Sequence, residues 1–218
     1  MKNIALLLFL FAQPANADIV RMRPFEKGNR SVGLQIGVAR PTEPSFSETV
    51  RTGPDINIQA LYYQWDWIAV GTELNFTRFL SKQFGAPAGL RTVPASTDLS
   101  SSAQAISLSV LTRVNFFESG TWSPYMLGGV GMSRFEQTVD AVVPGATAGT
   151  FDTTITKGNS TAMVISAGLG IEVFTVRDAS LSVEARFRQY NLDEAIFLSD
   201  AQSVSLAFGF HFWWGRDW

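Results

Sequence analysis

The sequence predicts an all-β fold, an eight-stranded antiparallel up-and-down transmembrane β-barrel with long extracellular loops and short periplasmic turns. The first observation behind this is strict alternation in Ser203–Phe212, where even positions are large and apolar and odd positions are small or polar. Successive side chains of a strand point to opposite faces. The small polar face cannot build the core of a soluble barrel. An inverted barrel, with the apolar face toward lipid and the polar face toward a narrow lumen, accommodates both faces.

The second observation is the composition. Hydrophobic residues make up 46% of the 218 residues and charged residues 17%. This balance is typical of a membrane barrel, in which half of each strand is polar, and is too polar for a bundle of membrane helices. The formal net charge of −2 gives no reason to expect a nucleic-acid partner. The absence of cysteine excludes disulfides and thiolate metal sites.

The first 17 residues are predicted to be a signal peptide. Lys2 supplies the positive charge, Ile4–Ala12 forms the apolar segment, and Ala15-Asn16-Ala17 is a small-x-small cleavage site. The apolar run is too short to cross a bilayer as a helix; a retained N-terminal anchor is the alternative. Residues 18–30 are predicted to be a periplasmic lead-in, with a basic patch for anionic lipid headgroups as the alternative.

The third observation is that eight segments alternate in this way. Each is long enough to cross the membrane at the usual tilt of barrel strands. The predicted strands, in chain order, are Ser31–Arg40, Asp55–Tyr63, Trp67–Phe79, Ala103–Phe116, Pro124–Phe135, Ser160–Phe174, Leu181–Tyr190 and Ser203–Phe212.

Each strand is justified by its outward series, read at every second residue. In the first four strands these series are mostly aliphatic or aromatic, and run through Val32–Val38, Ile56–Tyr62, Ile68–Phe76 and Ile106–Val114. In the last three strands they run through Met163–Val173, Leu181–Phe187 and Val204–Phe212. The fifth strand does not alternate cleanly, because Leu127–Gly131 interrupts the pattern.

The predicted connections alternate between long and short. The long loops are Pro41–Pro54, Leu80–Ser102, Glu136–Asn159 and Asn191–Ala201, and the short turns are Gln64–Asp66, Phe117–Ser123 and Thr175–Ser180. This alternation is expected when one end of a barrel faces the exterior and the other the periplasm. Closure also removes the unpaired edges of an open sheet. Residues 31–218 are therefore predicted to be one barrel domain.

With its signal peptide, eight alternating strands and aromatic-rich last strand, the chain resembles the small OmpA/OmpX-type outer-membrane barrels of Gram-negative bacteria. Ser123–Gly131 is similar to the "PY-x-GGG-x-G" strand common there, and Val204–Phe212 resembles the C-terminal signal read by the outer-membrane insertion machinery. That signal usually ends at a terminal Phe, whereas here Trp213–Trp218 follow. The resemblance implies an outer-membrane location, contact with outer-membrane lipid and lipopolysaccharide, and contact with the insertion machinery during assembly. It names no ligand for the loops, and we expect no further domain after the barrel.

The predicted inward positions carry seven ionisable side chains, which are Glu73, Arg113, Glu172, Glu184, Arg186, Arg188 and His211. Side chains alone fill the interior of an eight-stranded barrel, and an unpaired buried charge is costly. We therefore expect neighbouring strands to pair Glu73 with Arg113, and Glu172 with Arg186 or Arg188, as a polar plug in the periplasmic half. This network either packs and closes the lumen or gates a narrow passage for ions or small solutes.

The protein is predicted not to be an enzyme. A lipid-A-modifying barrel needs a nucleophile and a base within hydrogen-bond reach, usually near the outer leaflet. His211 is the only histidine, and its position near the periplasmic end predicts a space-filling role. One histidine and scattered carboxylates lack the spacing of a zinc or calcium site, and no cofactor is expected.

The tryptophans at the short turns are predicted to form the inner interfacial girdle rather than to stack on a ligand; they are Trp65, Trp67, Trp122, Trp213 and Trp214. At the other end, Leu80–Ser102 and Glu136–Asn159 are predicted either to bind a partner or to be mobile linkers. The leading functional hypothesis is a non-enzymatic outer-membrane barrel with a structural or surface-interaction role, such as adhesion. A narrow channel is the alternative, and a lipid-A-modifying enzyme is the third hypothesis.

Overall fold

The computed structural model describes residues 25–85, 98–117, 121–144, 150–176, 178–195 and 198–215. Within them lie nine strands and one short helix, namely β1 (Arg30–Pro41), α2 (Pro44–Thr49), β2 (Val50–Arg51), β3 (Gly53–Trp65), β4 (Ile68–Gly85), β5 (Asp98–Asn115), β6 (Trp122–Pro144), β7 (Thr150–Val176), β8 (Ala179–Ala195) and β9 (Leu198–Trp214). The predicted signal peptide and most of the predicted lead-in lie outside the described residues. No helix in the described part of the chain is long and apolar enough to cross a membrane.

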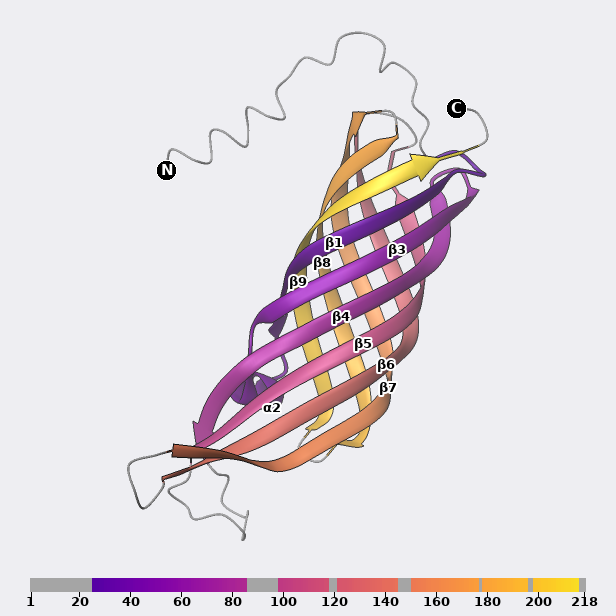
Figure 1. Ribbon diagram of the computed structural model, residues 1–218. Helices are drawn as coiled ribbons and strands as arrows, with labels where there is room; N and C mark the ends of the chain where they lie inside the picture. The colour runs from indigo at the N-terminus through magenta and orange to yellow at the C-terminus, as the bar shows by residue number, and fades with distance from the viewer. Residues whose placement is uncertain are drawn as a thin grey trace, which may run out of the picture.

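Eight of these strands form one closed antiparallel barrel (Figure 1). β1 pairs with β3 on one side and with β9 on the other, and the sheet continues through β8, β7, β6 and β5. The pairing of β4 with both β3 and β5 completes the circle. Closure gives every barrel strand two partners, as backbone groups in a bilayer require. The predicted fold class is confirmed; β2 is a two-residue strand added to β4.

The barrel is apolar outside and polar inside. On β9 the outward side chains are about half exposed, Phe208 at 63% and Val204 at 42%, whereas the inward Ser205 and His211 are buried. The same alternation of burial runs along β1 and β3. The inverted arrangement expected from the sequence is therefore present.

The two ends of the barrel differ. We call the end with the β3–β4, β5–β6 and β7–β8 connections the short-turn end, and the opposite end, which carries α2, the long-hairpin end. At the long-hairpin end β6 and β7 stay paired out to Pro144 and Thr150, well past the last β7–β8 rung at Met163. In Figure 1 this hairpin extends beyond the barrel at the lower left.

The loops predicted at the long-hairpin end are wrong in part, because the strands continue into them. β4 and β5 extend into Leu80–Ser102, and β6 and β7 extend into Glu136–Asn159. β8 and β9 similarly leave little of Asn191–Ala201. These extensions are rich in Ser, Thr and Gln, so the apolar alternation ends where the strands leave the lipid-facing band while the backbone pairing continues.

The predicted fifth strand, Pro124–Phe135, lies within β6. Its pattern is irregular because the inward positions switch from Leu127 to glycine. At Gly131 a Cβ would lie 2.1 Å from the carbonyl oxygen of Leu108 and 2.5 Å from Ser109 Oγ, so the close approach of β5 leaves no room for a side chain.

Helix α2 lies within the predicted loop Pro41–Pro54. Glu43 caps its N-terminus, since a carboxylate oxygen accepts the Phe46 N–H at 2.8 Å, and Pro44 occupies the first turn, where a missing N–H costs nothing. The helix ends at Thr49, and the backbone of its C-cap residue, Val50, is extended. These caps point Phe46 into the mouth of the barrel, where it is fully buried.

Candidate functional site in the barrel lumen

All seven lumen residues predicted from the sequence are buried, none more than 2% exposed: Glu73, Arg113, Glu172, Glu184, Arg186, Arg188 and His211. They come from β4, β5, β7, β8 and β9. Strict alternation places them all on the inner face, and they form the polar middle of the lumen.

Arg186 on β8 bridges two carboxylates. It forms ion pairs with Glu73 on β4 and with Glu184 on its own strand. β4 and β8 lie on opposite sides of the closed barrel, so the arginine spans the lumen. Glu73 also accepts a hydrogen bond from Gln59 Nε2 at 3.0 Å and lies 3.5 Å from Arg188 Nη2.

Arg188, two residues further along β8, forms a second ion group. Its guanidinium lies 3.1 Å from Asp55 Oδ2 and donates to Asn57 Oδ1 at 2.5 Å. Asp55 in turn accepts hydrogen bonds from Asn75 at 2.7 Å and from Thr77 at 2.6 Å. The carboxylate and the guanidinium are thus both satisfied, as a buried ion pair requires.

A third ion group, Arg113 with Glu172, lies nearer the short-turn end. Ser180 donates to Glu172. The Arg113 guanidinium stacks on the Tyr125 ring, 3.6 Å from its centroid, a cation–π geometry. The Tyr125 hydroxyl donates to Glu184 at 2.9 Å, so the tyrosine joins this pair to the Arg186 group.

The predicted pairing of Glu73 with Arg113 is wrong. In the β4–β5 register Glu73 lies opposite Ser109 and Arg113 opposite Ala69, so the two charges are four residues apart along the wall. Four residues of strand span about 13 Å. Glu73 instead meets Arg186 across the lumen.

The predicted pairing of Glu172 with Arg186 or Arg188 is wrong for the same reason. Glu172 lies opposite Ser182 on β8, whereas Arg186 lies opposite Gly168 and Arg188 is further still. Neighbouring strands did not decide the pairing, because the lumen of an eight-stranded barrel is narrow enough for arginine to reach other walls.

Two members of the network were missed from the sequence, Asp55 and Tyr125. Both occupy inward positions, and Asp55 shares the phase of Asn57 and Gln59 on β3. The alternation of inward and outward positions along β3 was the feature of the sequence from which Asp55 could have been predicted. Gln35, also inward, links two groups by donating to Glu184 at 3.1 Å and accepting from Gln59 at 3.2 Å.

The charges of the network do not balance. The buried lumen positions in the described part of the chain hold four carboxylates, Asp55, Glu73, Glu172 and Glu184, and three guanidinium groups, Arg113, Arg186 and Arg188. With His211 neutral, one negative charge remains in excess. Removing a cation therefore leaves a larger imbalance than removing a carboxylate.

His211 is fully buried on the inner face of β9. Its Nε2 lies 3.2 Å from Ser182 Oγ. Gly33 lies directly opposite on β1, and a Cβ there would be 2.3 Å from His211 Nδ1. The ring occupies the volume that the glycine leaves open.

An aromatic cluster closes the lumen at the short-turn end. This basal cluster consists of Phe25, Leu61, Tyr63, Ala69, Phe174 and Trp213. The ring of Phe25 lies 5.6 Å from that of Tyr63 and 5.7 Å from that of Trp213. Residues 25–29 of the predicted lead-in therefore pass into the base of the barrel, where the Phe25 carbonyl accepts the Trp67 N–H at 2.9 Å.

The assignment of Trp213 to the interfacial girdle is wrong. Trp213 shares the inward phase of His211, is 1% exposed, and donates its indole N–H to Ser180 at 2.8 Å. The other four tryptophans assigned to the girdle are exposed near the short-turn end, Trp65, Trp67, Trp122 and Trp214.

A second apolar cluster closes the long-hairpin end. We call it the upper cluster, although the long-hairpin end is drawn at the bottom of Figure 1. It consists of Ala39, Phe46, Val50, Phe79, Ala103, Ala105, Phe135, Ala162, Val164, Tyr190, Leu192 and Ala201. Phe46 from α2 is its central member, with its ring 4.8 Å from that of Phe79 and 5.8 Å from that of Phe135.

The lumen therefore has three layers, a polar middle between two apolar seals. A polar plug was expected to fill the periplasmic half of the lumen. At the short-turn end this expectation is wrong, because aromatic rings occupy the lumen there instead of polar groups. On β8 the inward positions from Ser180 to Arg188 are polar, and Tyr190 begins the upper cluster. No group of three or more His, Cys, Asp or Glu in the described residues is arranged to hold a metal ion.

Comparison with known proteins identifies a family whose model matches this chain. The model of the family described as outer membrane protein beta-barrel domain matches residues 4–212. Among solved structures the chain is similar to Neisserial surface protein A, with 15% identity, a TM-score of 0.53, and coverage of 85% of this chain and 99% of that one. No curated protein sequence matches the chain.

Two further solved structures are similar to the chain at lower TM-scores. The attachment invasion locus protein of Yersinia pestis, in complex with the heparin analogue sucrose octasulfate, has 14% identity and a TM-score of 0.47, covering 85% of this chain and 99% of that one. The N-terminal β-barrel domain of Pseudomonas aeruginosa OprF has 13% identity and a TM-score of 0.42, covering 85% and 100%. At these identities the likeness concerns the fold alone.

Proposed function

The chain belongs to the outer membrane protein β-barrel family, and from this premise we propose that it is a non-enzymatic scaffold with a structural or surface-interaction role. Membership of the family places the protein in the bacterial outer membrane. The barrel holds the protein in that membrane, and the long hairpins are the parts available to a partner.

The sealed lumen is the observation that carries this proposal. An ion crossing the barrel would have to displace the basal cluster around Phe25, break a buried ion network, and displace the upper cluster around Phe46. Each layer is held by side chains that contact one another. The lumen therefore acts as the core of the barrel and stabilises it rather than conducting.

Conductance in planar bilayers tests the scaffold against the alternative of a narrow channel. We expect the purified mature protein to show no steady openings. Steady openings that Glu73→Ala or Arg113→Ala removes would favour the channel and contradict the proposal. Arg134→Ala is the matched control, since Arg134 is exposed and pairs only with Glu136 in the described residues.

The absence of enzymatic activity is part of the same proposal. A serine nucleophile needs a base within hydrogen-bond reach, and the only histidine in the sequence contacts buried Ser182 inside the barrel. Substrate lipid would have to enter the packed lumen to reach this pair. Mass spectrometry of lipid A from cells with and without the protein should show the same species. A mass change that His211→Ala abolishes would establish an enzyme.

The surface-interaction role is supported by the extended β6–β7 hairpin. Loops and hairpins on a rigid scaffold commonly carry binding. Glu136 and Asn159 form one rung of the hairpin, so replacing the residues between them by Asn-Gly closes a two-residue turn without shifting the register.

Binding of whole cells to immobilised matrix proteins and polysaccharides then compares the full and shortened hairpins. We expect at least one surface to lose binding with the shortened protein while its heat-modifiable gel migration is unchanged. Identical binding profiles would leave the barrel a structural element only.

A further inference from the structure

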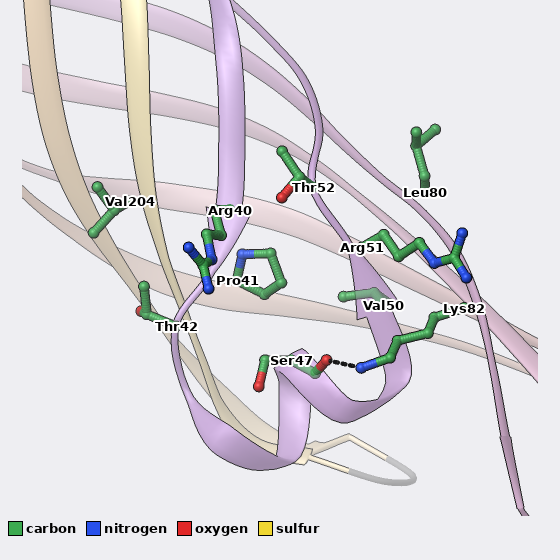
Figure 2. A pocket seen from close by; sticks show the side chains of 10 residues that line it. All are labelled: Arg40, Pro41, Thr42, Ser47, Val50, Arg51, Thr52, Leu80, Lys82 and Val204. Atoms are coloured by element: carbon green, nitrogen blue, oxygen red, sulfur yellow. Dashed lines mark hydrogen bonds between the residues drawn. The ribbon is translucent and has the colours of Figure 1, made fainter.

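A basic pocket lies on the outer wall of the barrel at the long-hairpin end, beside α2 (Figure 2). Its volume is about 940 Å³. Arg40, Arg51 and Lys82 supply its cations, and Val204 and Leu80 supply exposed aliphatic side chains. In Figure 2 the Arg40 side chain lies on one side of Pro41, and Arg51 and Lys82 lie on the other. No residue of the polar middle of the lumen lines the pocket, and Val50 is the one lining residue that also belongs to the upper cluster.

The pocket lies at the level where the lipid-facing band ends. On β1 the outward residues Val32–Val38 are apolar and exposed, and they are bounded by Arg30 at one end and Arg40 at the other. Ten residues of strand span about 33 Å. At the usual tilt this corresponds to about 25 Å along the membrane normal, the height of the apolar band of outer-membrane barrels. Arg40 therefore lies at the headgroup level of the leaflet nearest the long hairpins.

Two cross-strand pairs each join a cation to an aliphatic side chain. Arg40 lies directly opposite Val204 in the β1–β9 register, and Arg51 lies directly opposite Leu80 in the β2–β4 register. Val204 is 42% exposed and Leu80 47%. Side chains directly opposite in an antiparallel pair contact each other. Positive charge and apolar surface thus meet twice in the same pocket.

The cations of the pocket have no carboxylate partner in the described part of the chain. No acidic residue lines the pocket. Lys82 donates to the carbonyl of Ser47 at 2.7 Å, which leaves its charge uncompensated. The nearest acidic residues in sequence lie on the α2 segment; Glu43 is engaged in capping that helix, and Glu48 is exposed outside the lining.

We propose that this pocket binds the phosphate-bearing headgroup of a lipid in the outer leaflet. Arg40, Arg51 and Lys82 contact the phosphate oxygens, for which guanidinium groups provide charge-assisted and bidentate hydrogen bonds. Val204 and Leu80 contact the first carbons of the acyl chains. Apolar surface at headgroup level is the reason for choosing a lipid over a soluble anion. The site is independent of the proposed scaffold role.

Native mass spectrometry of the full mature protein tests this proposal. The protein is reconstituted with phosphatidylcholine containing either lipid A or enzymatically dephosphorylated lipid A, and retained lipid is measured after extraction into detergent. We expect lipid A to be retained and the dephosphorylated form to be lost. The double variant Arg40→Gln, Arg51→Gln should weaken retention by about tenfold for each arginine, the effect of removing one charge-assisted hydrogen bond.

The matched control is Arg78→Gln with Arg134→Gln, which removes the same charge from exposed positions outside the pocket. It should retain lipid A as the parent does. Equal retention by both double variants, or of both lipids, would overturn the proposal. Displacement of lipid A by inorganic phosphate, or by a sulfated polysaccharide at matched charge, would overturn the choice of a lipid and identify a site for soluble anions.

Discussion

The two ends of the lumen are closed by the same kind of residue held in different ways. Each seal centres on one phenylalanine from a segment flanking β1, Phe25 before it and Phe46 after it. Phe25 belongs to a stretch bonded to the wall, where Gly28 N–H donates to Tyr63 at 2.8 Å and Tyr63 N–H donates to Asn29 at 2.9 Å. The base of the barrel is thus continuous with the sheet.

Phe46 instead lies on a helix of six residues. The contacts of this segment with the wall include Lys82 bonded to Ser47 and the two rungs of β2. A helix this short has little stability of its own. The difference indicates that the upper seal yields first when the barrel is perturbed, while the base and the polar middle stay closed.

The largest effect is expected in the middle layer, which both ends protect. Arg186→Ala removes the cation between Glu73 and Glu184 and leaves both carboxylates buried with too little positive charge. Breaking a buried ion pair in this way costs about 3–5 kcal/mol in free energy of unfolding. Urea titration of the barrel, followed by heat-modifiable gel migration, measures the loss.

The exposed pair of Arg134 and Glu136 supplies the control for this prediction. Arg134 is 66% exposed, and Arg134→Ala should cost less than about 1 kcal/mol. If the two variants lost the same stability, the middle layer would be hydrated rather than a packed core, and the closed-lumen proposal would fail with it.

The comparison of the two ends is tested by Phe25→Ala and Phe46→Ala. Phe25→Ala should cost about 3 kcal/mol, because the bonded base cannot collapse around the cavity. Phe46→Ala should cost about 2 kcal/mol or less, because α2 can shift to fill the space. The same urea titration measures both variants.

Protease cleavage near α2 sharpens this second prediction. Phe46→Ala should raise cleavage within Pro44–Thr49, and Phe25→Ala should leave it unchanged. If the two variants lost the same stability and α2 were equally protected from the protease in both, the two seals would be equivalent. The proposed difference in how the two seals are held would then be wrong.

Along the strands that alternate cleanly, the inward residues could be predicted one by one, because alternation fixes which side chains point inward. Asp55 and Tyr125 were missed and Trp213 was assigned to the girdle, although all three lie at buried inward positions. Asp55 stood at a predicted strand start, Tyr125 in the strand without clean alternation, and Trp213 past the expected end of the barrel signal. The partners within the lumen could not be predicted. Register and the width of the lumen decide whether Glu73 meets Arg113 or Arg186, and neither is written in the local pattern.

The length of the hairpins also could not be predicted from the alternation of apolar residues. The apolar period that marks β7 within Ser160–Phe174 ends where the strand leaves the lipid-facing band, while its backbone pairing with β6 continues to Thr150. Helix α2 was hidden for a related reason. Its six residues include one buried side chain, Phe46. A single buried residue produces no apolar periodicity from which a helix could be predicted.

The smallest effect concerns the cap of α2 and its response to acid. Partial burial of the Glu43 carboxyl raises its pKa, but hydrogen bonds from the Ser45 hydroxyl and the Phe46 N–H lower it more, so the pKa lies below its ordinary value. The stabilisation from the cap is therefore complete above the unfolded-state pKa of about 4.3 and is lost as the pH falls through the lower value in the folded protein.

The amide resonance of Phe46 in micelles should shift over that acidic range, and protection of α2 from proteolysis by an acid-active protease should fall with it, by less than about 1 kcal/mol. Glu43→Gln keeps a hydrogen-bond acceptor without the titration, so its protection should not vary over the same range. If both proteins gave the same acid profile, the upper seal would be held by the packing of Phe46 alone, and the difference between the two ends would rest on backbone hydrogen bonds rather than on the cap.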